Sequence, residues 1–314
     1  MCKDKPVGLD RGNYSLAVLL ILLSGLGFAL MSLFVNLAGD LPATQKGFFR
    51  NFVAFLVSLA ILLQRKHGKG GVKTFWRAEL SKKNLPWLIL RSAFGTAGIL
   101  FNFYAVSHLP LANASVLNKL SPFFTIIFAA LFLREKVNKA QVAGLVLAFA
   151  GVLLVSRPDA GAYSLAHLWP ILVGLAGGLA AGVAYTCVRH LGKRGADGSF
   201  IVTFFSGFSC LALLPGLLLN YHPMTAYQWL MVLLIGCGAL IGQYGITFAY
   251  RYAAPGQISI YDYSMVIFSV LLGVLVLGER PDVYTLLGIA VVFLAFLVMF
   301  LYNRHRSEKM VSRG

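Results

Sequence analysis

Long apolar stretches, separated by short polar connections, run through most of this chain. A helix needs about 20 apolar residues to cross the ~30 Å hydrocarbon core of a bilayer. Ten stretches meet this requirement and are predicted to be membrane-spanning helices: 15–37, 44–64, 85–107, 112–133, 138–156, 166–189, 199–219, 226–250, 256–277 and 282–302. Because most connections are very short, we expect consecutive helices to pack as antiparallel hairpins.

The composition supports this interpretation. Of the 314 residues, 58% are hydrophobic and 12% are charged, and the mean hydropathy is +0.77. A soluble domain is about half apolar and about a quarter charged. We therefore expect a multi-pass protein of the cell inner (plasma) membrane, with the lipid bilayer as its main partner. The first apolar stretch is long and many similar stretches follow, so we interpret it as a retained span rather than a signal peptide.

The net charge of +16 follows a sided distribution. If the N-terminus is cytoplasmic, the cytoplasmic segments hold 21 of the 27 Lys and Arg residues, and the opposite loops hold only Arg157 and Arg280. This bias is the positive-inside pattern of membrane proteins, and it predicts that both termini are cytoplasmic. The charge thus indicates topology, and we expect no nucleic acid among the partners.

An internal repeat relates the two halves of the chain. A shift of 144 residues places "NASVLNKLSPFFTIIFAALFLREK" over "QISIYDYSMVIFSVLLGVLVLGER" and pairs Asn118 with Asp262. Each half holds five spans, an odd number, so the second half should enter the membrane upside down. We predict an all-α integral membrane protein with ten transmembrane helices as two inverted five-helix repeats. The predicted parts are listed in order: an N-terminal tail 1–14, a first repeat 15–157, a second repeat 163–303 and a basic tail 304–314.

Two related stretches resemble the drug/metabolite transporter superfamily, EamA type. They are "FNFYAVSHLPLANASVLNKLSPFFTIIFAALFLREKVNKAQVAGLVLAFAGVLLVSRP" and "FAYRYAAPGQISIYDYSMVIFSVLLGVLVLGERPDVYTLLGIAVVFLAFLVM". Each combines an aromatic-Ala start, a Pro or Gly turn, and a span that ends in an acidic residue with a basic neighbour. The resemblance covers about residues 15–303 and implies a transporter of amino acids, drugs, nucleotide sugars or other metabolites.

Four charged residues inside the spans are the first candidates for a binding site. A charge in hydrocarbon costs about 2.5–3.5 kcal/mol on insertion scales, so it persists where it faces a cavity or a partner. Lys119 and Asp262 lie at similar depths in spans that the repeat brings together, where they could form an ion pair or jointly hold a zwitterion. Arg50 and Arg91 suit carboxylate or phosphate groups, although both could instead extend their side chains to a nearby interface.

Polar and aromatic residues near the same depth complete the predicted site. Pro122 is expected to bend its helix and to free a carbonyl group beside Lys119. The substrate-binding candidates are Asn118, Lys119, Tyr261, Asp262, Tyr263, Arg50, Arg91, Asn102, Tyr185 and Gln243. Asp262 is also the candidate for coupling to a proton or another cation. No metal site, cofactor or catalytic residue is predicted.

These observations favour a secondary active transporter, an exporter of a small polar or amphipathic metabolite such as an amino acid, working by alternating access. A channel or a scramblase-like protein is the first alternative, but it should carry a continuous polar stripe along one helix. An integral-membrane enzyme is the second, but the sequence lacks HExxH, GxSxG and a nucleotide-binding loop. The chain is expected to act as a monomer or a homodimer.

Overall fold

In a computed structural model, the protein is described over residues 11–64, 71–108, 117–137, 139–156, 168–278 and 282–311. These residues form helices and short connections, without a strand among them. Seven segments are long and apolar enough to cross a membrane. Three shorter apolar helices, Ser121–Leu133, Lys139–Leu154 and Val283–Met299, fall within the remaining predicted spans. The all-helical membrane fold predicted from the sequence is therefore confirmed.

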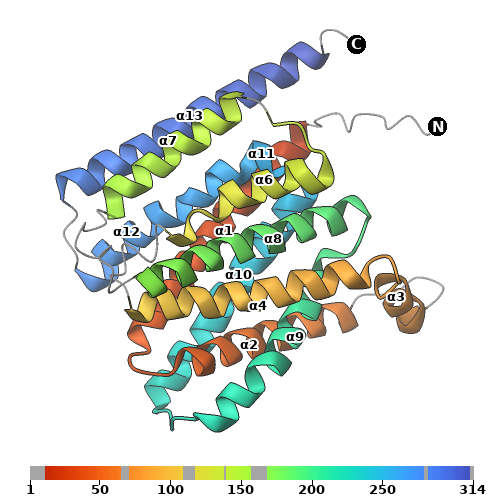
Figure 1. The fold of residues 1–314 in the computed structure, drawn as a ribbon, viewed down its shortest axis with the longest axis vertical. Helices are drawn as coiled ribbons and strands as arrows, with labels where there is room; N and C mark the ends of the chain where they lie inside the picture. Colours follow the sequence, from red (N-terminus) through yellow and green to blue (C-terminus); the bar gives the residue numbers. More distant parts are fainter. Residues whose placement is uncertain are drawn as a thin grey trace.

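The helices fall into two series with matching order (Figure 1). The first series comprises α1 (Arg11–Leu37), α2 (Ala43–Gln64), α4 (Leu85–His108), α6 (Ser121–Leu133) and α7 (Lys139–Ser156). The second comprises α8 (Leu168–Lys193), α9 (Gly198–Leu219), α10 (Ala226–Tyr252), the group α11 (Pro255–Ile258), η3 (Ser259–Tyr263) and α12 (Ser264–Leu277), and α13 (Val283–Val311).

The packing repeats between the two series. Helix α1 lies along α10, and its counterpart α8 lies along α4. Helix α1 also contacts α12, as α8 contacts α6, while α2 pairs with α9 and α7 with α13. Exchanging every helix for its counterpart leaves this pattern unchanged, as expected for two repeated halves. The α7–α13 pair lies at one edge of the bundle (Figure 1).

The α6 and α12 helices end in the same way. The residue after each helix adopts the left-handed conformation: Arg134, at φ 53°, follows α6, and Gly278, at φ 68°, follows α12. Glycine adopts this conformation without steric cost, whereas arginine does so uncommonly. The backbone amide of Arg134 donates a hydrogen bond to Ala129, and that of Gly278 donates to Gly273. These two positions are related by the 144-residue shift of the repeat.

Two local features differ from the sequence prediction. Helix α6 begins at Ser121, so Pro122 lies in its first turn, where the missing amide costs nothing; it does not bend a continuous helix. The connection between the predicted spans 44–64 and 85–107 contains a short helix, α3 (Gly71–Glu79). Phe75 and Trp76 of α3 pack edge-to-face on Phe200 of α9. Aromatic burial therefore holds this segment against the bundle.

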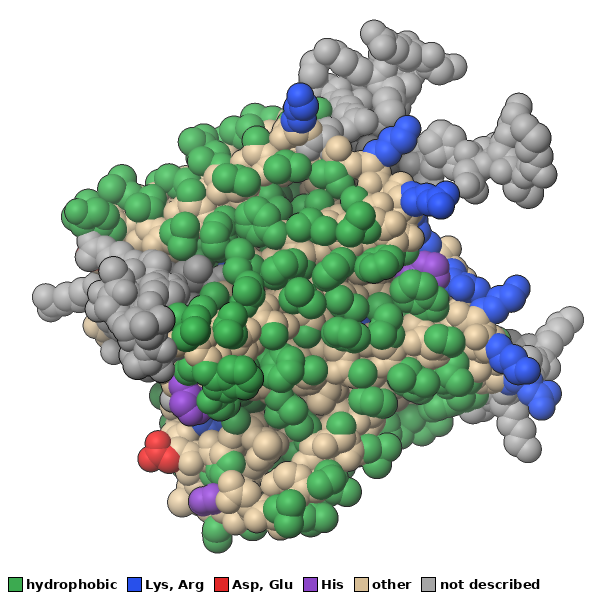
Figure 2. Space-filling model, viewed as in Figure 1, with side chains coloured by type: hydrophobic (Ala, Val, Ile, Leu, Met, Phe, Trp, Pro, Cys, Tyr) green, Lys and Arg blue, Asp and Glu red, His purple; other side chains and the backbone are tan. Residues whose placement is uncertain are grey.

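The surface has the two zones of a membrane protein. Figure 2 shows hydrophobic side chains covering the broad visible face and Lys and Arg side chains gathered along one edge. In the same orientation, Figure 1 places α3 at that edge. Large exposed hydrophobics include Leu131, Phe132, Leu211, Leu218 and Leu275. A surface of this kind belongs against lipid hydrocarbon, with the cationic edge in water.

Candidate substrate cavity

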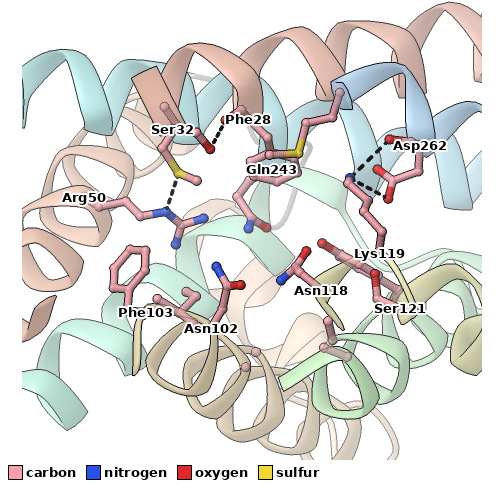
Figure 3. A pocket seen from close by; sticks show the side chains of 18 of the residues that line it. Phe28, Ser32, Arg50, Asn102, Phe103, Asn118, Lys119, Ser121, Gln243 and Asp262 are labelled. Atoms are coloured by element: carbon pink, nitrogen blue, oxygen red, sulfur yellow. Dashed lines mark hydrogen bonds and ion pairs between the residues drawn. The ribbon is translucent and has the colours of Figure 1, made fainter. Parts of the chain in front are cut away.

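A cavity of about 120 Å³ lies within the bundle, between the two series of helices (Figure 3). Its lining comes from α1, α2, α4, α6, α8, α9, α10, η3, α12 and the segment that precedes α6. Eight of the ten predicted substrate-binding residues contribute to it: Arg50, Arg91, Asn102, Asn118, Lys119, Tyr185, Gln243 and Asp262.

Irregular backbone carries the charged pair of the cavity. The chain turns at Lys119 and Leu120 before α6 begins, and the tighter 3₁₀ turn η3 holds Asp262 before α12 begins. Backbone that leaves the α-helical form at membrane depth is tolerated where it lines a cavity. The two breaks lie at equivalent places in the two halves, so each half presents one polar segment to the same space.

Lys119 and Asp262 meet across the junction of the halves. The Lys119 Nζ lies 3.5 Å from Asp262 Oδ2 and donates a hydrogen bond of 3.3 Å to the Asp262 carbonyl. In return, the Tyr263 hydroxyl donates a 3.0 Å hydrogen bond to the Lys119 carbonyl. Lys119 and Tyr263 are equivalent under the 144-residue shift, so the exchange is nearly symmetric. The side chains of Lys119 and Asp262 are 6% and 7% exposed.

Arg50 reaches the cavity from α2. Its Nε lies 3.1 Å from the Met31 sulfur, and its Nη1 donates a 3.2 Å hydrogen bond to Asn51 Oδ1. Asn51 is itself held by a 2.9 Å hydrogen bond to the Gly47 carbonyl. With only 3% of its surface exposed, Arg50 does not extend to the interface. The guanidinium therefore sits in the bundle with weak, uncharged acceptors.

Arg91 reaches the cavity from α4. Its Nη2 donates a 2.9 Å hydrogen bond to Gln243 Oε1, and its Cζ lies 3.9 Å from the centre of the Phe205 ring. A guanidinium over an aromatic face is favourable and fixes the plane of the group. Arg91 is 2% exposed, and its Nε has no hydrogen-bond partner among the described residues. This arginine is also fully withdrawn from the interface.

Amide side chains lie between the charged ends of the cavity. Figure 3 shows Asn102, Asn118 and Gln243 between Arg50 on one side and the Lys119–Asp262 pair on the other. Tyr185 lines the same cavity, and its ring packs 5.7 Å from that of Tyr250. Amides can both donate and accept hydrogen bonds, so the middle of the cavity suits polar groups of either kind.

Two predicted residues, Tyr261 and Tyr263, are not part of the described lining. The Tyr261 hydroxyl lies 3.3 Å from that of Tyr14, and Tyr263 is bonded to the Lys119 carbonyl. The cause is the 3₁₀ turn, in which successive side chains point about 120° apart. When Asp262 faces the cavity, its two neighbours must face the surrounding helices. Both tyrosines support the broken segments instead.

Several lining residues were not predicted. Phe205 provides the aromatic face for Arg91, and Met31 provides the sulfur near Arg50. Both are apolar residues in apolar spans, so nothing in the sequence distinguishes them from lipid-facing residues. Gly95 could have been predicted from the sequence, because it lies four residues after Arg91 and therefore on the same face of the helix. A methyl group there would collide with Arg91 Nη1.

The charges of the cavity do not balance. Arg50, Arg91 and Lys119 contribute three positive charges, and Asp262 contributes one negative charge. Within the described residues, only Lys119 among these cations forms an ion pair with a carboxylate. No group of three or more potential metal ligands occurs in the same described part of the chain. The cavity is thus a small, cationic, amide-lined space at the junction of the halves.

Comparison with known proteins identifies relatives over almost the full chain. The sequence profile of the EamA-like transporter family matches residues 15–157 and 168–301. The pseudopaline exporter of Pseudomonas aeruginosa is 31% identical, over 90% of this chain and 95% of its own length. A riboflavin transporter of Vibrio cholerae is 27% identical, over 93% and 96%. A solved crystal structure has the same fold, with a TM-score of 0.79 and 19% identity over 93% of this chain and 98% of its own.

Proposed function

Because this chain belongs to the EamA-like transporter family, we propose that it is a secondary active exporter of a small polar or amphipathic metabolite, such as an amino acid. The cargo binds in the central cavity, and the two halves move so that the cavity opens to each side of the membrane in turn. Family membership alone indicates a multi-pass membrane transporter of small molecules. The proposal adds the direction of transport and the kind of cargo.

The Lys119–Asp262 contact carries the proposal. It joins the two halves at their broken segments and lies beside the cavity. Discontinuous helices at the interface of repeats are where secondary transporters bind substrate and coupling ions. A channel would instead place polar side chains along a continuous path, whereas here the charged and amide residues cluster around one cavity between the two series of helices.

The relatives support export. The protein of Pseudomonas aeruginosa is named as an exporter of pseudopaline, and the one of Vibrio cholerae as a transporter of riboflavin. Both names denote movement of a small organic molecule across a membrane. The exporter is the more similar of these two over a comparable share of the chain, so outward movement is the direction that we propose.

Asp262 is proposed as the coupling group. Its carboxylate exchanges partners between Lys119 and a proton or another cation as the halves move apart and together. Asp262→Asn keeps the size of the side chain and removes its charge. We expect this variant to fold and to lose accumulation of cargo against a gradient, with passive exchange remaining. Asp40→Asn, the same change at an exposed position, is the control.

The experiment compares the medium of cells that express the wild type, Asp262→Asn, Asp40→Asn or an empty vector, using untargeted mass spectrometry. The wild type and Asp40→Asn should enrich the same metabolite in the medium at least severalfold, and Asp262→Asn should not. If no metabolite distinguishes the wild type from the vector, export is the wrong function. If Asp262→Asn exports as well as the wild type, the carboxylate is only structural.

A further inference from the structure

The excess positive charge of the cavity points to the chemical class of the cargo. Two buried guanidinium groups, Arg50 and Arg91, line the cavity, and neither forms an ion pair with a carboxylate in the described part of the chain. Among the described lining residues the only acid is Asp262, and it is already paired with Lys119. The cavity therefore holds a formal charge of +2 without a counter-charge from the protein.

Such an arrangement is costly unless a ligand completes it. An uncompensated charge inside a membrane segment costs about 2.5–3.5 kcal/mol or more, and buried charges are normally paired. Arg50 and Arg91 are both almost fully withdrawn from the surface, at 3% and 2% exposed. An anion bound between them would provide the missing counter-charge. A neutral or cationic cargo would leave both groups unpaired.

Part of each guanidinium group has no hydrogen-bond acceptor among the described residues. Hydrogen bonds occupy Nε and Nη1 of Arg50 and Nη2 of Arg91. Among the described residues, Nε of Arg91 is buried without a partner, and Nη2 of Arg50 is left free. Each guanidinium thus presents part of its fork, which matches one planar carboxylate better than a phosphate that needs several donors around it.

The plane of each guanidinium is fixed before a ligand arrives. Phe205 lies 3.9 Å under the Cζ of Arg91, and Asn51 and Met31 hold the group of Arg50. Donors that are already oriented lose less conformational entropy on binding. Asn102 and Asn118 lie between Arg50 and Lys119 and can bind polar groups of a cargo (Figure 3).

We infer that the cargo is an organic dianion whose two carboxylates are bound by Arg50 and Arg91, one at each guanidinium. The inference rests on the proposed function and narrows it to one substrate class. In the state that the structure shows, Lys119 and Asp262 neutralise each other and take no part in balancing the charge of this cargo.

The test measures binding directly, without relying on transport. Purified protein is titrated at constant ionic strength with α,ω-dicarboxylates of four to eight carbons, with their matched monoamides and diamides, and with inorganic phosphate. A ligand that binds the folded state raises its melting temperature. At least one dicarboxylate should bind about tenfold more tightly than its monoamide, the loss expected for one charge-assisted hydrogen bond, and its diamide should bind more weakly still.

Variants assign the effect to the two guanidinium groups. Arg50→Gln and Arg91→Gln should each weaken dicarboxylate binding about tenfold or more, whereas Arg77→Gln, the same change at an exposed position on α3, should not. Arg50→Lys and Arg91→Lys retain the charge and should restore part of the affinity. If a glutamine variant fails to fold, the corresponding lysine variant still tests whether that guanidinium group contributes to dicarboxylate affinity.

Three results would overturn the inference: diamides that bind as tightly as dicarboxylates, no dicarboxylate that binds, or dicarboxylate binding that survives both glutamine substitutions. Preferential binding of phosphate would assign the site to a phosphorylated cargo and would also contradict it. A separate exchange assay in proteoliposomes uses the dicarboxylate that binds. If this compound binds but is not exchanged, the proposed carrier function fails while the assignment of the binding site stands.

Discussion

Buried guanidinium groups need acceptors, and the two arginines of the cavity obtain them in different ways. Arg50 uses a thioether sulfur and a neighbouring amide, whereas Arg91 uses an amide from the other half and an aromatic face. The sequence predicted both as site candidates because charges are rare in apolar spans. It did not predict Met31 or Phe205, since their contribution depends on which face of a helix meets the cavity.

The space for Arg91 depends on Gly95. A methyl group at position 95 would collide with Arg91 Nη1 and lie 2.8 Å from Phe205 Cε2. We expect Gly95→Ala to displace the guanidinium from the ring, to weaken dicarboxylate binding as Arg91→Gln does, and to destabilise the protein by about 1–3 kcal/mol. Gly47→Ala is the control, because the nearest atom to its added methyl is at an ordinary 3.4 Å. Equal melting temperatures and dicarboxylate affinities for the two alanine variants would show that Arg91 tolerates a methyl group at position 95 and would contradict this prediction.

Outside the membrane segments, Glu79 gives a pH-dependent prediction. Its Oε1 accepts a 3.1 Å hydrogen bond from the Asp197 amide, and its Oε2 has no partner among the described residues. Burial raises the pKa of this carboxyl above its usual range, and the hydrogen bond from Asp197 only partly opposes the shift. The folded state therefore holds the proton more tightly than the unfolded state does.

The sign of the pH effect follows from that difference. Because the folded pKa is the higher one, the stabilising contribution is present below the unfolded pKa of about 4.3 and is lost as the pH rises through the folded pKa. Glu79→Gln keeps the acceptor and does not titrate. Melting temperatures measured from about pH 4 to pH 8 should therefore fall for the wild type relative to Glu79→Gln. A melting-temperature difference between the wild type and Glu79→Gln that is independent of pH, or that changes in the opposite direction, would contradict this account of Glu79.

At the scale of helices and turns, the two breaks beside the cavity are the features that matter most. The apolar pattern predicted the spans that contain them, because length and hydropathy are set by the bilayer. It did not predict where the helices stop, since Lys119 and Asp262 could each have been accommodated in a continuous helix. Their positions depend on contacts between the halves, such as the hydrogen bond from Tyr263 to the Lys119 carbonyl.

The carboxylate of Glu135 connects the end of α6 with α8. Glu135, just after α6, accepts a 2.8 Å hydrogen bond from Arg189 Nε of α8 and lies 3.1 Å from Lys193 Nζ. Arg189 also donates hydrogen bonds to the carbonyls of Tyr250 and Arg251 at the end of α10. The Glu135 side chain is 9% exposed and that of Arg189 is 13% exposed, so water screens this pair little.

Glu135→Gln should lower the melting temperature by several degrees, since each kcal/mol corresponds to about 2–4 °C in a chain of this size. It removes the charge that holds Arg189 while leaving the size of the side chain unchanged. Lys193→Gln should have a smaller effect, because the Lys193 side chain is 43% exposed. Thermal denaturation of both variants in detergent checks this order. A larger loss for Lys193→Gln would mean that α6, α8 and α10 are held together by other contacts.

For the whole molecule, the repeat explains how one cavity receives polar groups from both halves. The main helix pairs recur when the halves are exchanged, and the 144-residue shift relates the segments that carry Lys119 and Asp262. The sequence predicted this architecture because a duplicated pattern survives weak identity. It did not predict that α7 and α13 contribute nothing to the described lining, since their apolar character is the same as that of the inner helices.

Membrane sidedness remains a prediction from the cation bias, with both termini cytoplasmic. A fluorescent protein fused after Gly314 should fluoresce, and alkaline phosphatase fused there should be inactive. Alkaline phosphatase inserted after Asn220, between α9 and α10, should be active because that connection is predicted to face outwards. An active phosphatase after Gly314 would invert the topology and, with it, the proposed direction of transport.

Exchange across a sealed membrane tests the central claim, that one cavity alternates between the two sides, most directly. Proteoliposomes that contain purified protein are loaded with the metabolite that accumulates in the medium of expressing cells, and a trace of the labelled compound is added outside. A carrier should accumulate the label transiently above its external concentration, and loading with unlabelled cargo should speed its entry. A steady conductance with no stimulation by internal cargo would contradict alternating access and identify a channel.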